Sequence, residues 1–285
     1  MKFSLWTQYG ALNSKPVFDA FRMGARSLGF DTVDNSNADI DVIWSVLFNG
    51  RMAPNKTIWE KNLQTSKPTI VLEVGGIDRG TTWKVGLNGI NRDGYFGDGG
   101  NDRTRADSLG LVCKPWRSDG DFILICGQHD RSWQWRNMPP MSNWVMQTIE
   151  EIQKHTDRPI LFRPHPRCPL PHIEHEFKNV RRQDPQHIRG SYDDFDMSFR
   201  NVHATISYSS NPGIHSVLEG VPAFVGSASL AYDAANDIDF LHDIENPLKP
   251  ERQQWLNDYA WTEFTVEEIS QGIPIKRLTS AINLL

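Results

Sequence analysis

The chain has 285 residues, a mass of 32.5 kDa and a net charge of −5, from 30 Lys and Arg against 35 Asp and Glu. This length is enough for one large domain or two of ordinary size, and 39% hydrophobic residues can supply a packed core. The negative charge excludes binding to nucleic acid or membrane by bulk charge, although a local basic face is compatible with it.

No apolar run reaches the roughly 18 residues that a membrane span needs, and the first ten residues lack the apolar stretch of a signal peptide. The three cysteines are widely spaced and form no CxxC pair, so neither a disulfide framework nor a structural zinc site is expected. We therefore expect a soluble, cytoplasmic protein without membrane contacts.

The first part of the chain alternates strand-type and helix-type runs. We predict strands over 2–7, 39–48 and 69–74, and helices over 16–28 and 55–65. Gly29 is placed to end the first helix. The run 39–48 is almost continuously apolar, as in a parallel strand covered on both faces. From 75 to about 101, frequent Gly, Asn and Asp predict a loop with short strands.

A second series of the same kind follows a Pro/Trp-marked boundary near Trp116. We predict its strands over 122–126, 159–163, 179–182 (an edge strand), 202–207 and 222–225, and its helices over 142–155, 191–199 and 211–218. Ser142 is the expected N-cap of the first of these helices. A last helix is expected over about 266–283, packed on either domain.

Strands that alternate with helices predict βαβ units and parallel sheets. We therefore expect an α/β protein with two Rossmann-like domains that face each other across a cleft. The expected domains are 1–117 and 118–265, and the C-terminal helix over 266–285 packs back on one of them.

The strand over 159–163 runs into Arg163-Pro-His165-Pro-Arg167. The carboxyl ends of parallel strands are where open α/β sheets bind ligands. Two guanidinium groups that flank an imidazole, stiffened by prolines, suit a phosphate or pyrophosphate. The alternative is a Pro-rich surface turn whose arginines form salt bridges.

The segment from Ser207 to Gly213 follows another strand and opens a helix. Ser209, Ser210, Asn211 and Gly213 would expose N–H groups at the helix N-terminus, where the helix dipole favours an anion. Ordinary capping is the alternative. The same helix ends at Glu219, whose carboxylate is suited to accept hydrogen bonds from the two hydroxyls of a ribose.

A third polar loop, residues 127–131, follows the strand over 122–126. We expect Gln128 and Arg131 to line the same ligand site. The adjacent His129 and Asp130 are more typical of a solvated loop than of a catalytic pair.

Together these residues resemble the donor half of GT-B glycosyltransferases. The chain as a whole resembles bacteriophage enzymes that glycosylate 5-hydroxymethylcytosine in DNA, of the arabinosyl- and glucosyl-transferring kinds. The segments that carry this resemblance are 69–91, 94–100, 162–167 and 209–222. It implies transfer of arabinose or glucose from a UDP-sugar (or GDP-sugar) to hydroxymethylcytosine in duplex DNA, in the cytoplasm of an infected bacterium, with no cofactor required.

Such a transfer needs a base that takes the proton of the acceptor alcohol. Candidate carboxylates in or beside the Gly-rich loops are Asp78, which we rank first, then Asp98 and Glu73. Aspartates in such loops more often make Asx-turns.

Residues 51–117 hold eleven Lys and Arg against seven Asp and Glu, a local charge of +4. A DNA-facing domain would show this excess. The predicted DNA-binding residues are Arg79, Lys84, Arg92, Arg103 and Arg105. Trp83, Tyr95 and Phe96 could stack on a base, although such aromatics are more often part of a core.

We expect no metal site. His172 and His175 lack an evident third ligand, and basic residues with a helix N-terminus can stabilise a leaving diphosphate. Two other functions remain open: a GT-B transferase for a surface polysaccharide or teichoic-type acceptor, and a non-catalytic nucleotide-sugar or nucleic-acid binding module.

Overall fold

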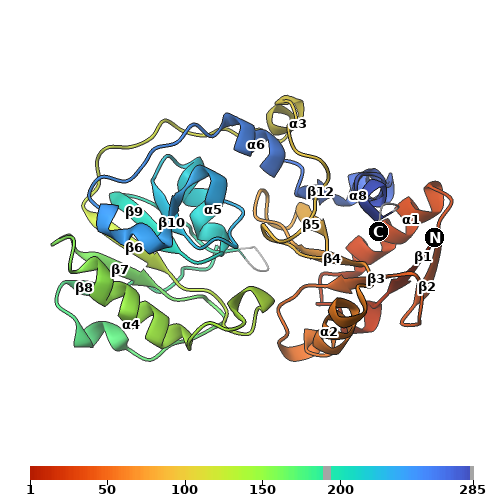
Figure 1. The fold of residues 1–285 in the computed structure, drawn as a ribbon, viewed down its shortest axis with the longest axis horizontal. Coiled ribbons are helices and arrows are strands. Elements are labelled where there is room, and N and C mark those ends of the chain that lie inside the picture. Colours follow the sequence, from red (N-terminus) through yellow and green to blue (C-terminus); the bar gives the residue numbers. More distant parts are fainter. Residues whose placement is uncertain (189–193, 283–285) are drawn as a thin grey trace. The chain divides into compact units, whose positions relative to one another are not determined.

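The computed structural model describes residues 1–188 and 194–282. The chain forms two compact units, Met1–Leu109 with Asn257–Leu285, and Gly110–Leu256 (Figure 1). The domain limits expected from the sequence lie elsewhere. Residues 110–117 belong to the second unit and residues 257–265 to the first, because strand β12 near the C-terminus joins the first sheet.

The sheet of the first unit has the strand order β12-β5-β4-β3-β1-β2. Four of its strands run parallel, namely β1 (Lys2–Leu5), β2 (Asp31–Asp34), β3 (Ile40–Trp44) and β4 (Thr69–Val74). The other two, β5 (Thr82–Leu87) and β12 (Glu263–Thr265), add antiparallel pairings. All five residues of β3 are buried, which confirms the strand covered on both faces.

The helices of this unit are α1 (Lys15–Ser27), α2 (Asn55–Thr65), α3 (Thr104–Ser108), α7 (Val266–Ser270) and α8 (Ile273–Ile282). Side chains of α1, α7 and α8 share one core with those of the sheet. Helix α2 is tied to the sheet by polar bonds as well. The Asn62 side chain donates to Asp41 (2.8 Å) and Thr69 (2.8 Å), and the Asn55 side chain donates to the carbonyl oxygen of Trp44 (2.7 Å).

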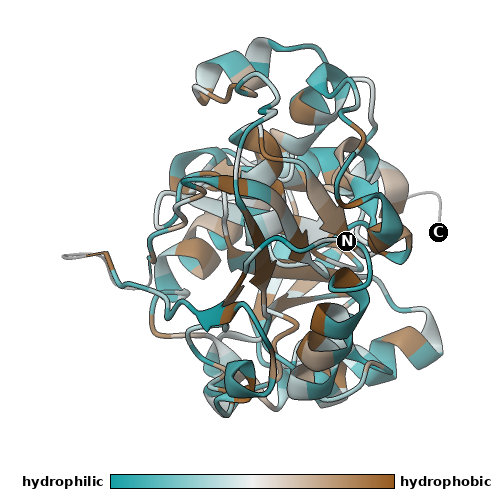
Figure 2. Ribbon diagram, turned by 90° about the vertical axis from the view of Figure 1, so that its left-hand side faces the viewer, coloured by the Kyte–Doolittle hydropathy of each residue, from teal (hydrophilic) through white to brown (hydrophobic). Residues whose placement is uncertain are grey.

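The sheet of the second unit is parallel throughout, with the order β11-β10-β9-β6-β7-β8. Its strands are β6 (Phe122–Cys126), β7 (Ile160–Arg163), β8 (Val180–Arg182), β9 (Val202–Ser207), β10 (Ala223–Val225) and β11 (Asn236–Asp237). The helices are α4 (Met141–Ile152) and α5 (Asn211–Leu218), and α6 (Gln253–Tyr259) spans the limit between the units. Hydrophobic residues concentrate on the strands and on the inner sides of the helices (Figure 2).

Most predicted elements of both units are confirmed to within a few residues. Strands β2, β11 and β12 and helices α3 and α6 were not predicted. The predicted N-cap is wrong, because Pro140 caps α4 and Ser142 lies inside it. The single helix expected over 266–283 is two helices, since Gly272 adopts φ +78° between them. Of the helix expected over 191–199, residues 191–193 lie outside the described residues and 194–199 are not helical. No helix in the described part of the chain is long and apolar enough to span a membrane.

The buried carboxylate of Glu263 holds the β4–β5 loop. Its oxygens accept from the N–H groups of Gly76 (2.7 Å) and Ile77 (2.9 Å) and from the Thr82 hydroxyl (2.7 Å). A Cβ atom on Gly75 would lie 2.4 Å from this carboxylate and 2.3 Å from the Thr82 carbonyl oxygen. Gly75 is therefore needed here, because a larger residue would displace the Glu263 side chain that reaches the loop from β12.

We predict that Glu263→Ala destabilises the protein by about 3–5 kcal/mol, because it leaves buried donors of the loop without an acceptor. Chemical denaturation would measure this change. Glu267→Ala removes an exposed carboxylate from the adjacent helix α7 and should change the free energy of unfolding by less than about 0.5 kcal/mol. Equal effects of the two substitutions would contradict the role given to Glu263.

Candidate functional site

Three polar loops meet at the carboxyl edge of the second sheet. Residues 127–131 follow β6, residues 164–168 follow β7, and residues 208–210 join β9 to α5. Strand β6 lies between β7 and β9, and Cys126 is in register with Arg163 on one side and Ser207 on the other. The parallel register therefore places the three loops side by side, as a ligand site in an open α/β sheet requires.

Direct bonds join the three loops. The amide oxygen of Gln128 accepts from the backbone N–H of Ser209 (3.0 Å) and from its hydroxyl (3.1 Å). Gly127 N–H donates to the carbonyl oxygen of Arg163 (2.9 Å). Gln128 and Ser209 are both buried, so Gln128 acts as a brace between two loops, whereas the sequence indicated a residue that lines the site.

Two histidines pack edge to face in these loops, with the ring centroids of His129 and His165 5.6 Å apart. The Nδ1 atom of His165 accepts from the N–H of Arg167 (3.1 Å), and Nδ1 of His129 accepts from the N–H of Arg131 (3.2 Å). In a neutral ring these bonds place the proton on Nε2. Burial lowers the pKa of His129, whereas His165 is half-buried and Arg167 and Arg131 are exposed.

Arg163 does not flank His165 in the way the sequence suggested. As the last residue of β7 it points to the same sheet face as Cys126, and its guanidinium is buried. Its Nη2 donates to the side chain of Gln183 (2.6 Å) and to the carbonyl oxygen of Ser198 (2.8 Å). Its Nη1 is buried and has no hydrogen-bond partner among the described residues.

The start of α5 packs closely on the sheet. A Cβ atom on Gly213 would lie 2.6 Å from Ser207 Oγ and 2.9 Å from a methyl group of Val225. Gly213 is therefore needed for packing. Ser210 has the extended backbone of an N-cap, but its hydroxyl makes no cap bond. In the described part of the chain, the buried hydroxyl oxygens of Ser207 and Ser210 both lack a hydrogen-bond partner. Ser207 was not among the predicted site residues. Its position as the last residue of a parallel strand could have indicated it.

Glu219 lies at the opposite end of α5 from this edge, about 12 Å away for an eight-residue helix. Its carboxylate pairs with Lys114 (2.6 Å) and Arg117 (3.6 Å). It lines a separate cavity of about 620 Å³ with His215 and Arg200. The structure thus does not bring Glu219 together with Ser209–Gly213, as the predicted ribose contact assumed.

In the first unit, Glu73 stands at the carboxyl end of β4, beside the end of β3. One carboxylate oxygen accepts from the Ser45 hydroxyl and the other from the Val74 N–H (2.7 Å). Burial is the main influence on Glu73 and raises its pKa, while the Ser45 bond and the charge of Lys84 oppose this. Ser45 adopts φ +63°, a strained conformation for serine that is typical of functional sites.

Lys84 places a positive charge between the carboxylates of Glu73 and Glu263. It is in register with Glu73 on β4 and with Glu263 on β12, and its side chain is buried. Burial lowers its pKa, and the two carboxylates oppose that shift. Lys84 and Glu263 are buried and Glu73 is half-buried, and the side chains of these three residues form one charged row across three strands.

The other two candidate carboxylates are exposed. Asp78 lies in the turn between β4 and β5, where its backbone carbonyl accepts from the N–H groups of Thr81 and Thr82. Asp98 accepts from the Tyr95 hydroxyl (2.9 Å). Neither carboxylate is buried, whereas that of Glu73 is half-buried.

The predicted DNA-binding residues divide into two groups. Lys84 and Arg105 are buried, and Arg105 pairs with Glu268 (2.5 Å) and donates to the carbonyl oxygens of Ala260 and Glu263. These two cannot contact a phosphate backbone, so their prediction was wrong. Arg92 and Arg103 are exposed and Arg79 is partly exposed. Trp83 is part of the core, 5.7 Å from Trp44.

Two groups of side chains within the described residues bring three metal-ligating atoms within 4.8 Å of one another. In the first, His129 Nδ1 already accepts from Arg131, and burial raises the pKa of the Cys168 thiol. In the second, Glu174 joins His172 and His175 as the third group that the sequence analysis missed. Both histidines are largely exposed, and His172 bonds Glu174 (2.7 Å). The first group lies within the loops at the sheet edge, and the second lies at the short 3₁₀ segment Ile173–Glu176, away from that edge.

We predict that Ser45→Ala raises the pKa of Glu73 further, because the Ser45 hydroxyl donates to the ionised carboxylate and so favours it. NMR titration of the Glu73 side chain would measure the shift. Ser66→Ala, which removes a serine at the end of α2 in the same unit, should leave the titration unchanged. A lower Glu73 pKa in the Ser45 variant would contradict the assignment.

No family model and no curated protein matches the sequence. Solved structures with a similar fold include the KpsC β-Kdo 2,7 transferase of Thermosulfurimonas dismutans, with 14% identity and a TM-score of 0.53 over 97% of this chain and 100% of that chain. The β-Kdo 2,4 transferase of KpsC from the same organism has 12% identity and a TM-score of 0.51, over 96% and 98% of the two chains. At these identities the likeness concerns the fold, and it confirms the predicted α/β fold class of GT-B type over the full chain.

Proposed function

We propose that the protein is a glycosyltransferase that uses a nucleotide-activated sugar. The observation that carries this proposal is the edge of the second sheet, where three loops meet at the start of α5 and the buried Ser207 and Ser210 hydroxyls lack partners. Two of the similar structures, both of matching length, are Kdo transferases. This similarity supports sugar transfer as the activity of this protein. A non-catalytic binding module could use the same edge. The raised pKa of Glu73 supports an enzyme instead, because a general base needs this property.

The phosphate groups of the donor would bind at the start of α5. The helix dipole favours an anion there, and the unpartnered hydroxyl groups of Ser207 and Ser210 lie beside this helix start. Arg167 and the Nε2–H of His165 add donors from the neighbouring loop. As the bond to the sugar breaks, negative charge grows on the leaving phosphate, and fixed donors of this kind stabilise that charge without a metal ion.

Glu73 is the general base in this proposal. Its raised pKa means that the carboxylate holds a proton more firmly than an exposed glutamate does. It would remove the proton from the acceptor hydroxyl while the oxygen attacks the anomeric carbon. Ser45 and the Val74 N–H hold the carboxylate in place. We rank Glu73 above Asp78 and Asp98 because Glu73 is half-buried at the end of β4 and its pKa is raised, whereas Asp78 and Asp98 are exposed in loops.

The acceptor we propose is the hydroxymethyl group of 5-hydroxymethylcytosine in duplex DNA, with a UDP-sugar as donor. The resemblance of residues 69–91, 94–100, 162–167 and 209–222 to phage enzymes supports it. Arg92 and Arg103 are exposed and Arg79 is partly exposed, as contacts to phosphate require. A sugar acceptor in a surface polysaccharide is the second candidate. The similarity to two Kdo transferases and the burial of Lys84 and Arg105 favour it.

One experiment separates the acceptors. The purified protein is incubated with UDP-glucose or UDP-arabinose and either hydroxymethylcytosine duplex DNA or a panel of oligosaccharides, and the products are weighed by mass spectrometry. A pentose or hexose added to the modified base supports the DNA acceptor, and a sugar added to an oligosaccharide supports the second candidate. The absence of both transfer and nucleotide binding would contradict the proposed function.

For donor binding, we predict that Arg167→Ala weakens the affinity for the cognate nucleotide about tenfold, because a charge-assisted bond to phosphate is lost. Isothermal titration with uridine, guanosine, cytidine and adenosine nucleotides would identify the cognate one and measure the change. Arg181→Ala removes an equal charge from the exposed edge strand β8 and serves as the control. If both variants bind as the unmodified protein does, Arg167 is not part of the donor site.

For the base, we predict that Glu73→Gln lowers the transfer rate at least about a hundredfold while nucleotide affinity is unchanged, because the amide cannot accept the proton. Steady-state rates and titrations on the same preparation would show the separation. Asp78→Asn should retain most of the activity. The opposite result, with loss only in the Asp78 variant, would transfer the role of base to Asp78.

A further inference from the structure

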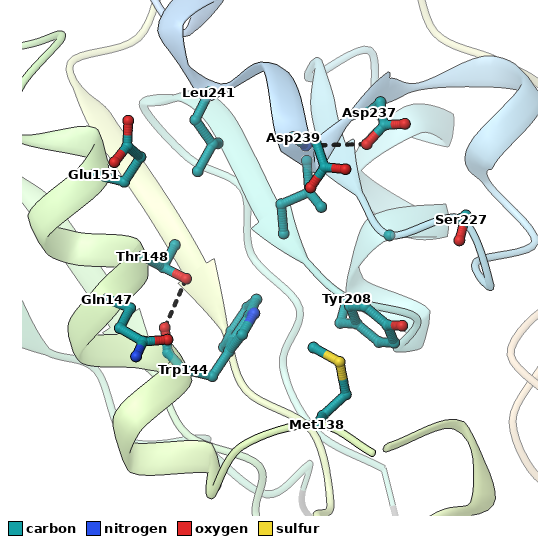
Figure 3. A pocket seen from close by; sticks show the side chains of 12 residues that line it. Met138, Trp144, Gln147, Thr148, Glu151, Tyr208, Ser227, Asp237, Asp239 and Leu241 are labelled. Carbon is teal, nitrogen blue, oxygen red and sulfur yellow. Dashed lines mark hydrogen bonds between the residues drawn. The ribbon is translucent and has the colours of Figure 1, made fainter. Parts of the chain in front are cut away.

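A cavity of about 400 Å³ lies in the second unit on the α4 side of the sheet, within the range of about 300–1,000 Å³ that small-molecule sites occupy. One face of α4 forms a wall with Trp144, Gln147, Thr148 and Glu151 (Figure 3). The opposite wall comes from the ends of β9, β10 and β11, with Tyr208, Gly226, Ser227, and the segment Asp237–Asp239.

The aromatic side chains on one side of this cavity pack closely against one another. The buried ring of Trp135 packs edge to face against both Trp144 (5.5 Å) and Tyr208 (5.2 Å). A Cβ atom on Gly226 would lie 2.6 Å from the Tyr208 ring, so only glycine lets this ring take its position. Met138 and Leu241 complete an apolar surface.

The polar side chains of the cavity are of a different kind from those of the donor edge. The Asp237 carboxylate is held by the Tyr232 hydroxyl (2.6 Å) and by the N–H of Asp239 (3.0 Å). Asp239 itself points toward the space between the walls (Figure 3), and no described residue bonds its carboxylate. Gln147, Ser227 and the Tyr208 hydroxyl add groups that both donate and accept. The described lining contains no Lys or Arg.

We propose that this cavity is a binding site for a neutral sugar ring. A sugar combines an apolar C–H face, which fits the surface of Trp144 and Tyr208, with hydroxyl groups that donate to Asp239. The same hydroxyls accept from Gln147 and Ser227. Phosphate is repelled by the carboxylates, and a simple cation would leave the amide and hydroxyl donors without acceptors.

The cavity lies on the opposite face of the sheet from the proposed donor site, although Tyr208 belongs to one of the three loops of the sheet edge. Arg163, Cys126 and Ser207 point to the other face of the sheet, whereas Tyr208, the next residue, packs with the core on the α4 side. The sugar site therefore goes beyond the proposed function. It gives the second unit a place to hold a sugar unit of a glycan that is not the activated donor.

Saturation-transfer NMR with neutral disaccharides (maltose, cellobiose and lactose) tests the site on the full-length protein. We expect at least one disaccharide to bind, and Asp239→Ala to weaken that binding about tenfold because a hydrogen bond to a charged group is lost. Asp243→Ala removes an exposed carboxylate from the same short 3₁₀ segment, Ile238–Asp243, outside the cavity, and should have no effect.

Two further ligands make the result specific. Tetramethylammonium tests a cation site, and UDP tests the donor edge independently, so that failure of the donor site is not mistaken for failure of the sugar site. The proposal is overturned if no disaccharide binds, if Asp239→Ala leaves the affinity unchanged, or if tetramethylammonium binds in place of the sugars.

Discussion

The parallel hydrogen-bond register of the second sheet is the constraint on which the site depends. Because β7, β6 and β9 run side by side in the same direction, Arg163, Cys126 and Ser207 lie level with one another, and each strand delivers its following loop to the same edge. The bonds from Ser209 to Gln128 and from Gly127 to Arg163 then lock these loops together. Gln128 and Ser209, which are 81 positions apart in the chain, thereby come into direct contact at this edge.

In the first unit, buried carboxylates have a comparable organising role. Glu263 arrives from near the C-terminus to bind the backbone beside Gly76, and Lys84 separates its charge from that of Glu73. This row explains why Lys84 and Glu263 tolerate burial, since each charge has an opposite neighbour. It also leaves Glu73 at a strand end with a raised pKa, which is the property that a base for an alcohol needs.

The sequence predicted α2, β4, β6, β9 and α5 with the bounds that the structure shows. The strands among them are apolar runs, and Pro or Gly lies near the ends of most of these segments, which are local properties of the chain. Strand β5 was expected only as part of a Gly-rich loop, and β2 and β12 were missed. All three owe their strand conformation to pairing with partners distant in the sequence, such as Thr82 with Thr265, and local propensity does not record such pairing.

The α/β class and the three polar loops that follow β6, β7 and β9 could be predicted from the residues alone, because strand ends and turn residues are set by short-range patterns. Which side chains in those loops face a ligand depends on the folded chain. The strand alternation turns Arg163 into the sheet, α5 carries Glu219 away from the loop edge, and Lys84 and Arg105 become buried partners of glutamates. Side-chain direction and charge pairing depend on neighbours that the fold brings from elsewhere in the chain, so no local pattern could reveal them.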